Sequence, residues 1–128
     1  MENPIADYQK IQKNYNQLVS KNYQLPSKTP QDGENVLVDH RPIKITMMVR
    51  NQQVTIITIH CSEDGNQAWD EVFEGFEQGM GWSSIKFFNA YQKAVRDRQT
   101  VTATAHGIQA VHESKPNNLT VTLTRVGD

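Results

Sequence analysis

Four segments with the residue pattern of β-strands constrain the fold of this chain more than any other feature. The segments are residues 43–50, 54–61, 100–111 and 119–124. Three of them alternate apolar and polar residues, which is typical of strands with one buried face, and the second is apolar on both sides, as in a central strand. Short turns at residues 51–53 and 115–118 join the segments into two antiparallel hairpins. Gly107 is interpreted as a bulge within the third segment.

Three further segments carry apolar residues at spacings of three and four, which predicts amphipathic helices. They cover residues 5–23, 66–78 and 83–98. Asp64 and Gln67 have the spacing of a capping box at the start of the second helix, and Gly79-Met80-Gly81 ends it. The aromatic side chains of the second and third helices, Trp69 among them, are expected to pack in the core.

The element order α-β-β-α-α-β-β predicts a two-layer α+β domain. Its four-stranded antiparallel sheet forms from the two hairpins and carries the helices on one face. We expect a single domain over residues 1–128, since 128 residues leave little room for two. Within it, residues 5–23 form the N-terminal helix and residues 24–42 a Pro-rich connection with at most a short edge strand at 36–38. The ββααββ core spans residues 43–126.

Charge and cysteine content exclude several classes of protein. Lys and Arg total 13 against 14 Asp and Glu, a net charge of −1, which argues against a strongly basic nucleic-acid binder and an acidic DNA mimic. Cys61 is the only cysteine, so an internal disulfide and a CxxC motif are excluded. There is no apolar run long enough for a membrane span and no signal-peptide pattern. We therefore expect a soluble cytoplasmic protein that makes no membrane contact.

The charges are nevertheless unevenly placed along the chain. Residues 63–81 sum to −6, whereas residues 82–98 sum to +3. Acidic residues near a helix N-terminus and basic ones near a C-terminus suit the helix dipole, which is the simpler interpretation. The alternative is an acidic patch that binds a basic partner, or a basic helix end that contacts phosphate.

No set of residues has the spacing of a known catalytic or metal centre. The four histidines show none of the HxH, HxxxH or HExxH spacings, so we assign no metal site and no cofactor. A pair formed by His60 and His106 on neighbouring strands stays geometrically open. Glycine-rich phosphate loops and the GxSxG motif are absent. No catalytic residue is assigned, although a small enzyme that uses Cys61 and a histidine base is kept as an alternative.

A nucleic-acid-binding function is the main alternative to a protein-binding one. The order α-β-β-α-α-β resembles the bacterial type of KH domain, but the loop at residues 78–82 lacks the GxxG sequence with which that family clamps the nucleic-acid backbone. The helix pair can also be laid on a helix-turn-helix template, in which the 83–98 helix is the reading helix. Glu74 and Gln78 then stand where the template has apolar residues, and the acidic supporting helix would repel phosphate. Its candidate contact residues are Ser83, Lys86, Asn89, Lys93 and Arg96.

We interpret the chain as a non-enzymatic binding or interaction module, an accessory protein of a bacterium or phage. Its expected partner is another protein or a second copy of itself. Tyr8, Tyr15 and Tyr23 on or beside the first helix are the candidate interface residues, because tyrosine buries a ring while its hydroxyl stays wet. The alternating threonines of the last two strand segments are expected to form a solvated sheet face.

Overall fold

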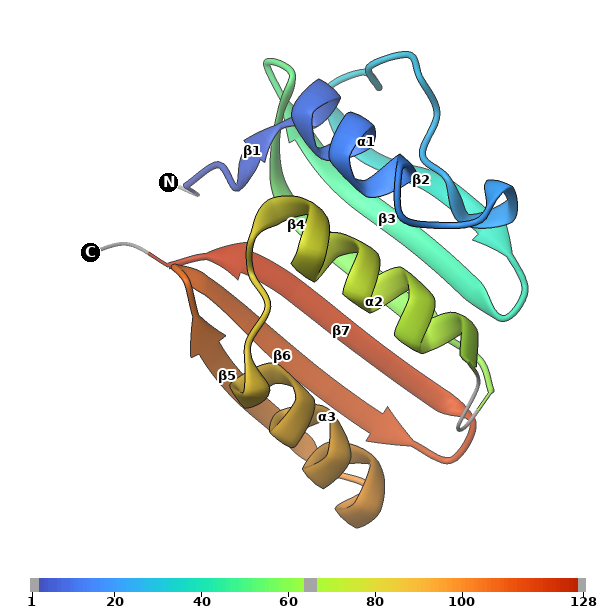
Figure 1. Cartoon of the computed structure of the whole chain (residues 1–128), viewed down its shortest axis with the longest axis vertical. Coiled ribbons are helices and arrows are strands. Elements are labelled where there is room, and N and C mark those ends of the chain that lie inside the picture. Colours follow the sequence, from blue (N-terminus) through green and yellow to red (C-terminus); the bar gives the residue numbers. More distant parts are fainter. Residues whose placement is uncertain (1–2, 64–66, 127–128) are drawn as a thin grey trace.

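The computed structural model describes residues 3–63 and 67–126. Within these residues the chain forms an α+β fold of two layers, a seven-stranded antiparallel sheet with three α-helices over one face (Figure 1). The elements are β1 (Ala6–Asp7), α1 (Tyr8–Asn16), a short 3-10 helix (Lys21–Tyr23), β2 (Gly33–His40), β3 (Ile43–Arg50), β4 (Gln53–Cys61), α2 (Gln67–Met80), α3 (Ile85–Asp97), β5 (Thr100–Ala105), β6 (Ile108–Lys115) and β7 (Asn118–Arg125).

The strand order divides the sheet into two halves of the same design. The order is β2-β3-β4-β7-β6-β5, and β1 pairs with the beginning of β4. In each half a helix is followed by a three-stranded meander, α1 by β2 to β4 and α3 by β5 to β7. The two meanders meet where β4 pairs with β7, and α2 lies over the middle of the sheet between α1 and α3 (Figure 1).

The prediction of a four-stranded sheet is wrong, and two local features explain the error. His106 and Gly107 both have positive φ, 54° and 76°, so they form a two-residue hairpin turn between β5 and β6 and not a bulge in one strand. Residues 33–40, assigned to the Pro-rich connection, form an edge strand paired with β3 along its length. The observed order thus has four strands before the α2–α3 pair and three after it, which also departs from the KH order.

The first helix is shorter than its apolar spacing predicts. Asp7 caps α1, since its carboxylate accepts a hydrogen bond from the Gln9 N–H at 3.0 Å, and the helix ends at Asn16. The chain then turns back, and Val19 and Leu25 enter the core from outside the helix. The two later helices lie within two residues of their expected bounds, while the predicted Asp64 cap lies outside the described residues.

The core fills the space between the sheet and the helices. Alternate residues of β3, β4, β6 and β7 are buried on the helix side and half-exposed on the other. α1 packs on α2 at Gly75, where a Cβ would lie 2.6 Å from Val19 and 3.1 Å from the Tyr15 ring. Tyr15 in turn stacks on Phe76 with ring centres 4.1 Å apart. Among residues 3–63 and 67–126, no helix combines the length and apolar character needed to cross a membrane.

Candidate functional site

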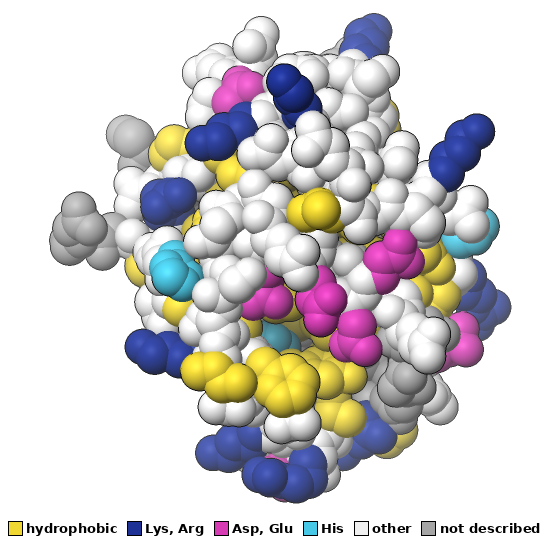
Figure 2. Space-filling model, in the orientation of Figure 1, with side chains coloured by type: hydrophobic (Ala, Val, Ile, Leu, Met, Phe, Trp, Pro, Cys, Tyr) yellow, Lys and Arg dark blue, Asp and Glu magenta, His cyan; other side chains and the backbone are white. Residues whose placement is uncertain are grey.

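A groove between α2 and α3 brings aromatic rings and carboxylates together on the helical side of the molecule. It is lined by Trp69, Asp70, Phe73, Glu74, Glu77, Phe87, Phe88 and Tyr91. Figure 2 shows this face, with a row of acidic side chains beside a hydrophobic patch. The free volume of about 40 Å³ holds a few water-sized groups, so the groove suits the end of one side chain and not a metabolite.

The spacing of residues along α2 explains why rings and carboxylates meet here. Trp69 and Phe73 are four residues apart and stack on one another, and both are buried. Asp70, Glu74 and Glu77 recur at spacings of four and three, which places them on an adjacent stripe of the same helix. The apolar stripe faces the sheet and α3, and the acidic stripe forms the rim of the groove.

The connection between α2 and α3 positions α3, which forms the other wall of the groove. Gly81 adopts a φ of +75° and stops α2, and Trp82 is buried, which anchors the linker. Ser84 caps α3 by accepting a hydrogen bond from the Lys86 N–H at 3.1 Å. The Ser84 N–H lies 3.3 Å from the Glu77 carboxylate and donates to it, so the acidic stripe is bonded to the start of α3.

The rings form a continuous aromatic layer under the groove. Trp69 stacks on Phe73 at 5.5 Å and on Tyr91 at 5.8 Å, with interplanar angles of 20° and 11°. Phe87 meets Phe73 edge to face at 6.1 Å. Phe88 also lines the groove, and its side chain remains 51% exposed. The face of an aromatic ring attracts cations, whereas its edge carries positive partial charge.

The groove is electrically negative. No lysine or arginine is among its lining residues, whereas three carboxylates are. Partial burial raises the pKa of Glu77 above its ordinary value; the Ser84 N–H opposes this shift, and repulsion from Glu74 adds to it. A cation placed in the groove would relieve this unfavourable environment of the Glu77 charge.

His112 lies beneath this groove, on the helix side of β6. Its side chain is completely buried, its ring centre is 6.0 Å from that of Phe73, and neither ring nitrogen has a hydrogen-bond partner among the described residues. Burial lowers its pKa to about 4, and the backbones of Val101 and Ala110 oppose that shift without reaching hydrogen-bond geometry. The imidazole is therefore neutral at neutral pH and offers one N–H and one acceptor nitrogen.

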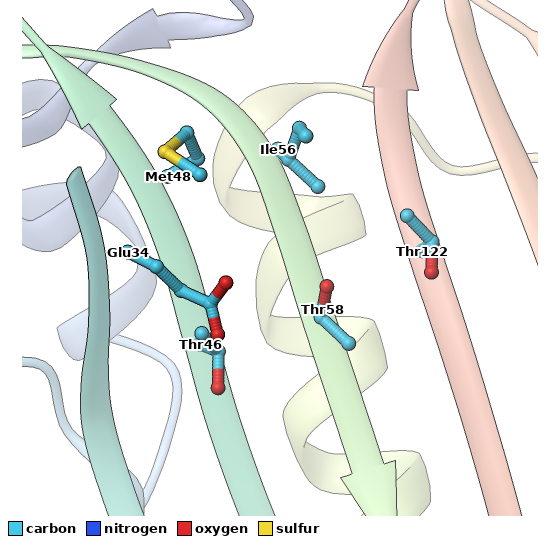
Figure 3. Close-up of a pocket in the computed structure, with 6 residues that line it drawn as sticks. All are labelled: Glu34, Thr46, Met48, Ile56, Thr58 and Thr122. Carbon is cyan, nitrogen blue, oxygen red and sulfur yellow. The ribbon is translucent and has the colours of Figure 1, made fainter.

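A second hollow lies on the opposite, helix-free face of the sheet. It has a volume of about 330 Å³ and is lined by Glu34, Thr46, Met48, Ile56, Thr58 and Thr122 (Figure 3). Thr58 is paired in register with both Thr46 and Thr122, so three hydroxyl groups form a row across β3, β4 and β7. Glu34 supplies the one carboxylate, from the edge strand β2. This face is shallow and carries no cluster of charge, so it is the weaker candidate site.

The structure places two of the three candidate interface tyrosines inside the molecule. Tyr8 and Tyr15 are completely buried. The Tyr8 hydroxyl donates to the carbonyl oxygen of Pro26, and the Tyr15 hydroxyl to that of Tyr23 at 2.9 Å. Tyr23 is half-buried and meets the edge of the His40 ring at 5.7 Å. In this fold Tyr8 and Tyr15 act in the core; the homodimer through residues 5–23 stays a prediction, to be checked by light scattering.

The structure brings together three of the five candidate nucleic-acid contacts. Lys86, Asn89 and Lys93 line a trough of about 460 Å³ between α3 and the edge strand β5. Ser83 precedes α3, and Arg96 lies near its other end, so neither lines this trough. α3 therefore separates an acidic aromatic groove from a trough with two lysines.

Cys61 and His106, one of the histidines that could serve as its base in the enzymatic alternative, do not lie together. Cys61 is buried, and its Sγ lies 3.3 Å from the carbonyl oxygen of Glu63. It pairs in register with Leu119 at the start of β7, whereas the turn at His106 adjoins Arg125 at the other end of β7. Six residues of strand, roughly 20 Å, separate these ends. Within the two described stretches, no three His, Cys, Asp or Glu side chains converge as metal ligands would.

Only some features of the groove are predictable from the residue pattern. The net charge of residues 63–81 left an acidic patch as the alternative to a simple helix-dipole effect. The aromatic residues of both helices were assigned to the core, where Trp69, Phe73 and Phe87 are buried. What the pattern did not show is that Phe88 stays exposed beside the carboxylates. The sequence around His112 does not reveal its environment. A histidine on the buried side of a strand gives the same residue pattern whether or not its ring is hydrogen-bonded.

Comparisons of the chain with protein-family models, with curated proteins and with solved structures find no match. The candidate site therefore rests on its own geometry.

Proposed function

We propose that the protein is a non-enzymatic interaction module that binds a positively charged segment of a partner protein in the α2–α3 groove. The observation that carries this proposal is a groove lined by the exposed Phe88 ring, by buried aromatic side chains and by the carboxylates of Asp70, Glu74 and Glu77. Binding hot spots are enriched in aromatic anchors and lie within a polar rim.

Two physical effects favour a cationic partner. The ring faces attract a cation through their quadrupoles, and this attraction strengthens when water is displaced. The carboxylates supply charge complementarity, which raises the association rate and excludes acidic partners. No neighbouring lysine or arginine on the groove walls competes for these carboxylates.

Fluorescence anisotropy tests the proposal with a labelled basic peptide that mixes Lys, Arg, Leu and Ser. Its counterpart with Asp and Glu in place of the basic residues is the negative control. We expect the basic peptide to bind, and Phe88→Ala to weaken binding about fivefold to tenfold, a cost of roughly 1 kcal/mol. Glu74→Gln should weaken binding severalfold and reduce its dependence on salt.

Matched substitutions outside the groove serve as controls. Val36→Ala removes a side chain that is 53% exposed on the edge strand β2, and Glu34→Gln removes a carboxylate on the opposite face of the sheet (Figure 3). Both should leave the affinity unchanged. If the basic peptide does not bind, or if the control variants weaken binding as much as the groove variants, the proposal is wrong.

An anionic partner is the second candidate, and the trough beside β5 favours it. Lys86 and Lys93 lie seven residues apart on one side of α3, so both reach the same linear ligand. A labelled single-stranded DNA in the same assay discriminates the two proposals. Salt-sensitive binding that is lost in the double variant Lys86→Ala, Lys93→Ala would favour nucleic acid, and binding unaffected by this variant would exclude the trough.

A further inference from the structure

We infer that the trough between α3 and β5 binds an extended acidic segment of a partner protein. This segment adds to the sheet as a strand beside β5 and pairs its carboxylates with Lys86 and Lys93. The trough is separate from the α2–α3 groove, so this inference does not depend on the basic partner proposed there.

The outer backbone edge of β5 is free. β5 ends the sheet on one side, and α3 lies along it (Figure 1). The two-residue turn between β5 and β6 makes Ala105 and Ile108 a hydrogen-bonded pair, and such pairs alternate with non-bonded ones along an antiparallel ladder. The exposed residues Thr100, Thr102 and Thr104 therefore turn their N–H and C=O groups away from β6. These groups are a template for one more strand.

β5 lacks the features that keep an edge strand from pairing. Proteins commonly protect such edges with charged residues, proline or a bulge. β2, at the other edge, carries Glu34 and Asp39 and has a register shift between Val36 and Val38. β5 contains only threonine, valine and alanine, and its register with β6 is unbroken. Of the two edges, β5 is therefore the one that is open to a further strand.

The trough beside this edge is positively charged. Its free volume is about 460 Å³, and its lining residues include two lysines and no carboxylate. Lys86 and Lys93 are exposed and lie two helical turns apart, roughly 10 Å. Asp97, the one carboxylate of α3, is already paired with Arg96 at 3.0 Å. Alternate side chains of an added strand, about 7 Å apart, would face α3, so glutamates at these positions come within reach of both lysines.

Two contacts hold the walls of the trough together. Near the start of α3, the His106 Nε2 atom donates to the carbonyl oxygen of Ser83 at 3.0 Å. At its end, Arg98 donates to the carbonyl oxygen of Lys115 at 3.2 Å. Both ends of α3 are thus bonded to the β5–β6 hairpin, which reduces the cost of ordering the site on binding.

The same features argue against two other occupants. If β5 paired with β5 of a second copy, the two α3 helices would lie side by side and bring four lysines together, which is unfavourable. Single-stranded nucleic acid binds by stacking its bases on aromatic rings as well as by charge, and no aromatic side chain lines the trough. An acidic peptide uses both the free backbone edge and the lysines.

Fluorescence anisotropy with a labelled peptide of alternating threonine and glutamate tests the inference. We expect the peptide to bind the native protein, and the double variant Lys86→Ala, Lys93→Ala to weaken binding about tenfold. The matched double variant Lys10→Ala, Lys13→Ala removes two exposed lysines from α1 and should leave the affinity unchanged. Equal losses in the two double variants would overturn the inference.

Two N-methylated forms of this peptide separate strand addition from simple charge attraction. One form is methylated on the amide nitrogens of its threonines and the other on those of its glutamates. Only alternate N–H groups of an added strand face β5, so one form should bind at least about tenfold more weakly and the other almost normally. Equal affinities of the two forms would exclude strand addition.

Amide hydrogen exchange in the native protein locates the added strand without any variant. The N–H groups of Thr102 and Thr104 should exchange rapidly in the free protein and at least about tenfold more slowly with the peptide bound, whereas those of Val101 and Ala103 are protected in both states. Unchanged exchange at Thr102 and Thr104 at saturation would overturn the inference. Tighter binding of single-stranded oligothymidine at this site, or a dimer that the peptide dissociates, would assign the trough to nucleic acid or to a second copy instead.

The trough and the α2–α3 groove can be tested separately. Phe88→Ala alters the groove and should leave binding of the threonine–glutamate peptide unchanged. Any binding of the acidic control peptide in the test of the groove should be lost in Lys86→Ala, Lys93→Ala. A failure of the threonine–glutamate peptide to bind would overturn this inference and leave the basic-partner module intact.

Discussion

His112 places a titratable ring inside an apolar layer, between β6 and the aromatic side chains of α2. Its pKa is about 4 in the folded protein against an ordinary value of 6.5, because burial disfavours the charged form. Between these two values the unfolded chain binds a proton that the folded protein does not. Stability is therefore unaffected above pH 6.5 and falls as the pH drops from about 6.5 to 4, by up to roughly 3 kcal/mol.

We predict that His112 causes this loss of stability at low pH, and that replacing His112 removes its contribution. The free energy of unfolding, measured by urea titration at pH 7 and pH 4.5, should fall more in the native protein than in His112→Leu. His60→Leu is the matched control, since the His60 ring lies on the other face, half-exposed beside Thr120. An equal loss in the native protein and in His112→Leu would show that carboxylates alone cause the pH dependence.

Among the secondary-structure elements, the contact of α1 with α2 depends on two glycines of α2. A Cβ at Gly75 would lie 2.6 Å from Val19 Cγ1 and 3.1 Å from a Tyr15 ring that is itself fixed against Phe76, and one at Gly79 would lie 3.1 Å from the Asn14 backbone. These glycines fit the small positions of a helix-turn-helix template, but here they let a neighbouring helix approach.

We predict that Gly75→Ala destabilises the protein by about 1–2 kcal/mol. Alanine favours a helix by roughly 1 kcal/mol, but the short, branched Val19 side chain and the stacked Tyr15 ring cannot move without disturbing the core. Gln78→Ala, on the exposed side of the same helix, should change stability by less than about 0.5 kcal/mol. Urea titration measures both, and a Gly75→Ala protein as stable as the native one would show that α1 shifts freely.

Some helices and strands were predictable from the residue pattern, and others were not. α2, α3, β3, β4 and β7 match the expected segments because their periodicity is long and uninterrupted. β2 was overlooked because Gly33 and the preceding prolines resemble a loop, and its pairing with β3 depends on contacts distant in sequence. β5 and β6 were merged because residues other than glycine uncommonly adopt the left-handed conformation that their turn requires at His106.

At the scale of the whole molecule, several contacts join the two halves of the sheet. β4 and β7 pair over six residues, β1 pairs with β4, and Arg125 at the end of β7 donates hydrogen bonds to the carbonyl oxygens of Pro4 and Ile5, at 3.2 and 3.0 Å. α2 contacts α1 on one side and α3 on the other. Neither half covers its own apolar surface without α2, so the halves should not unfold independently.

We predict a single cooperative unfolding transition. Trp69 and Trp82 report on α2 and on its connection to α3, whereas the amides of Ile11 and Tyr15 report on α1 at the far side of α2. Tryptophan fluorescence, far-ultraviolet circular dichroism and the slowest amide exchange at Ile11 and Tyr15 should give the same free energy of unfolding. A lower value from the α1 amides would mean that α1 detaches from a core that stays folded. In that case, deletion of residues 1–25 would leave a folded protein. If unfolding is a single transition, the deleted protein should be unfolded, because the deletion removes the buried side chains of Tyr8, Ile11 and Tyr15.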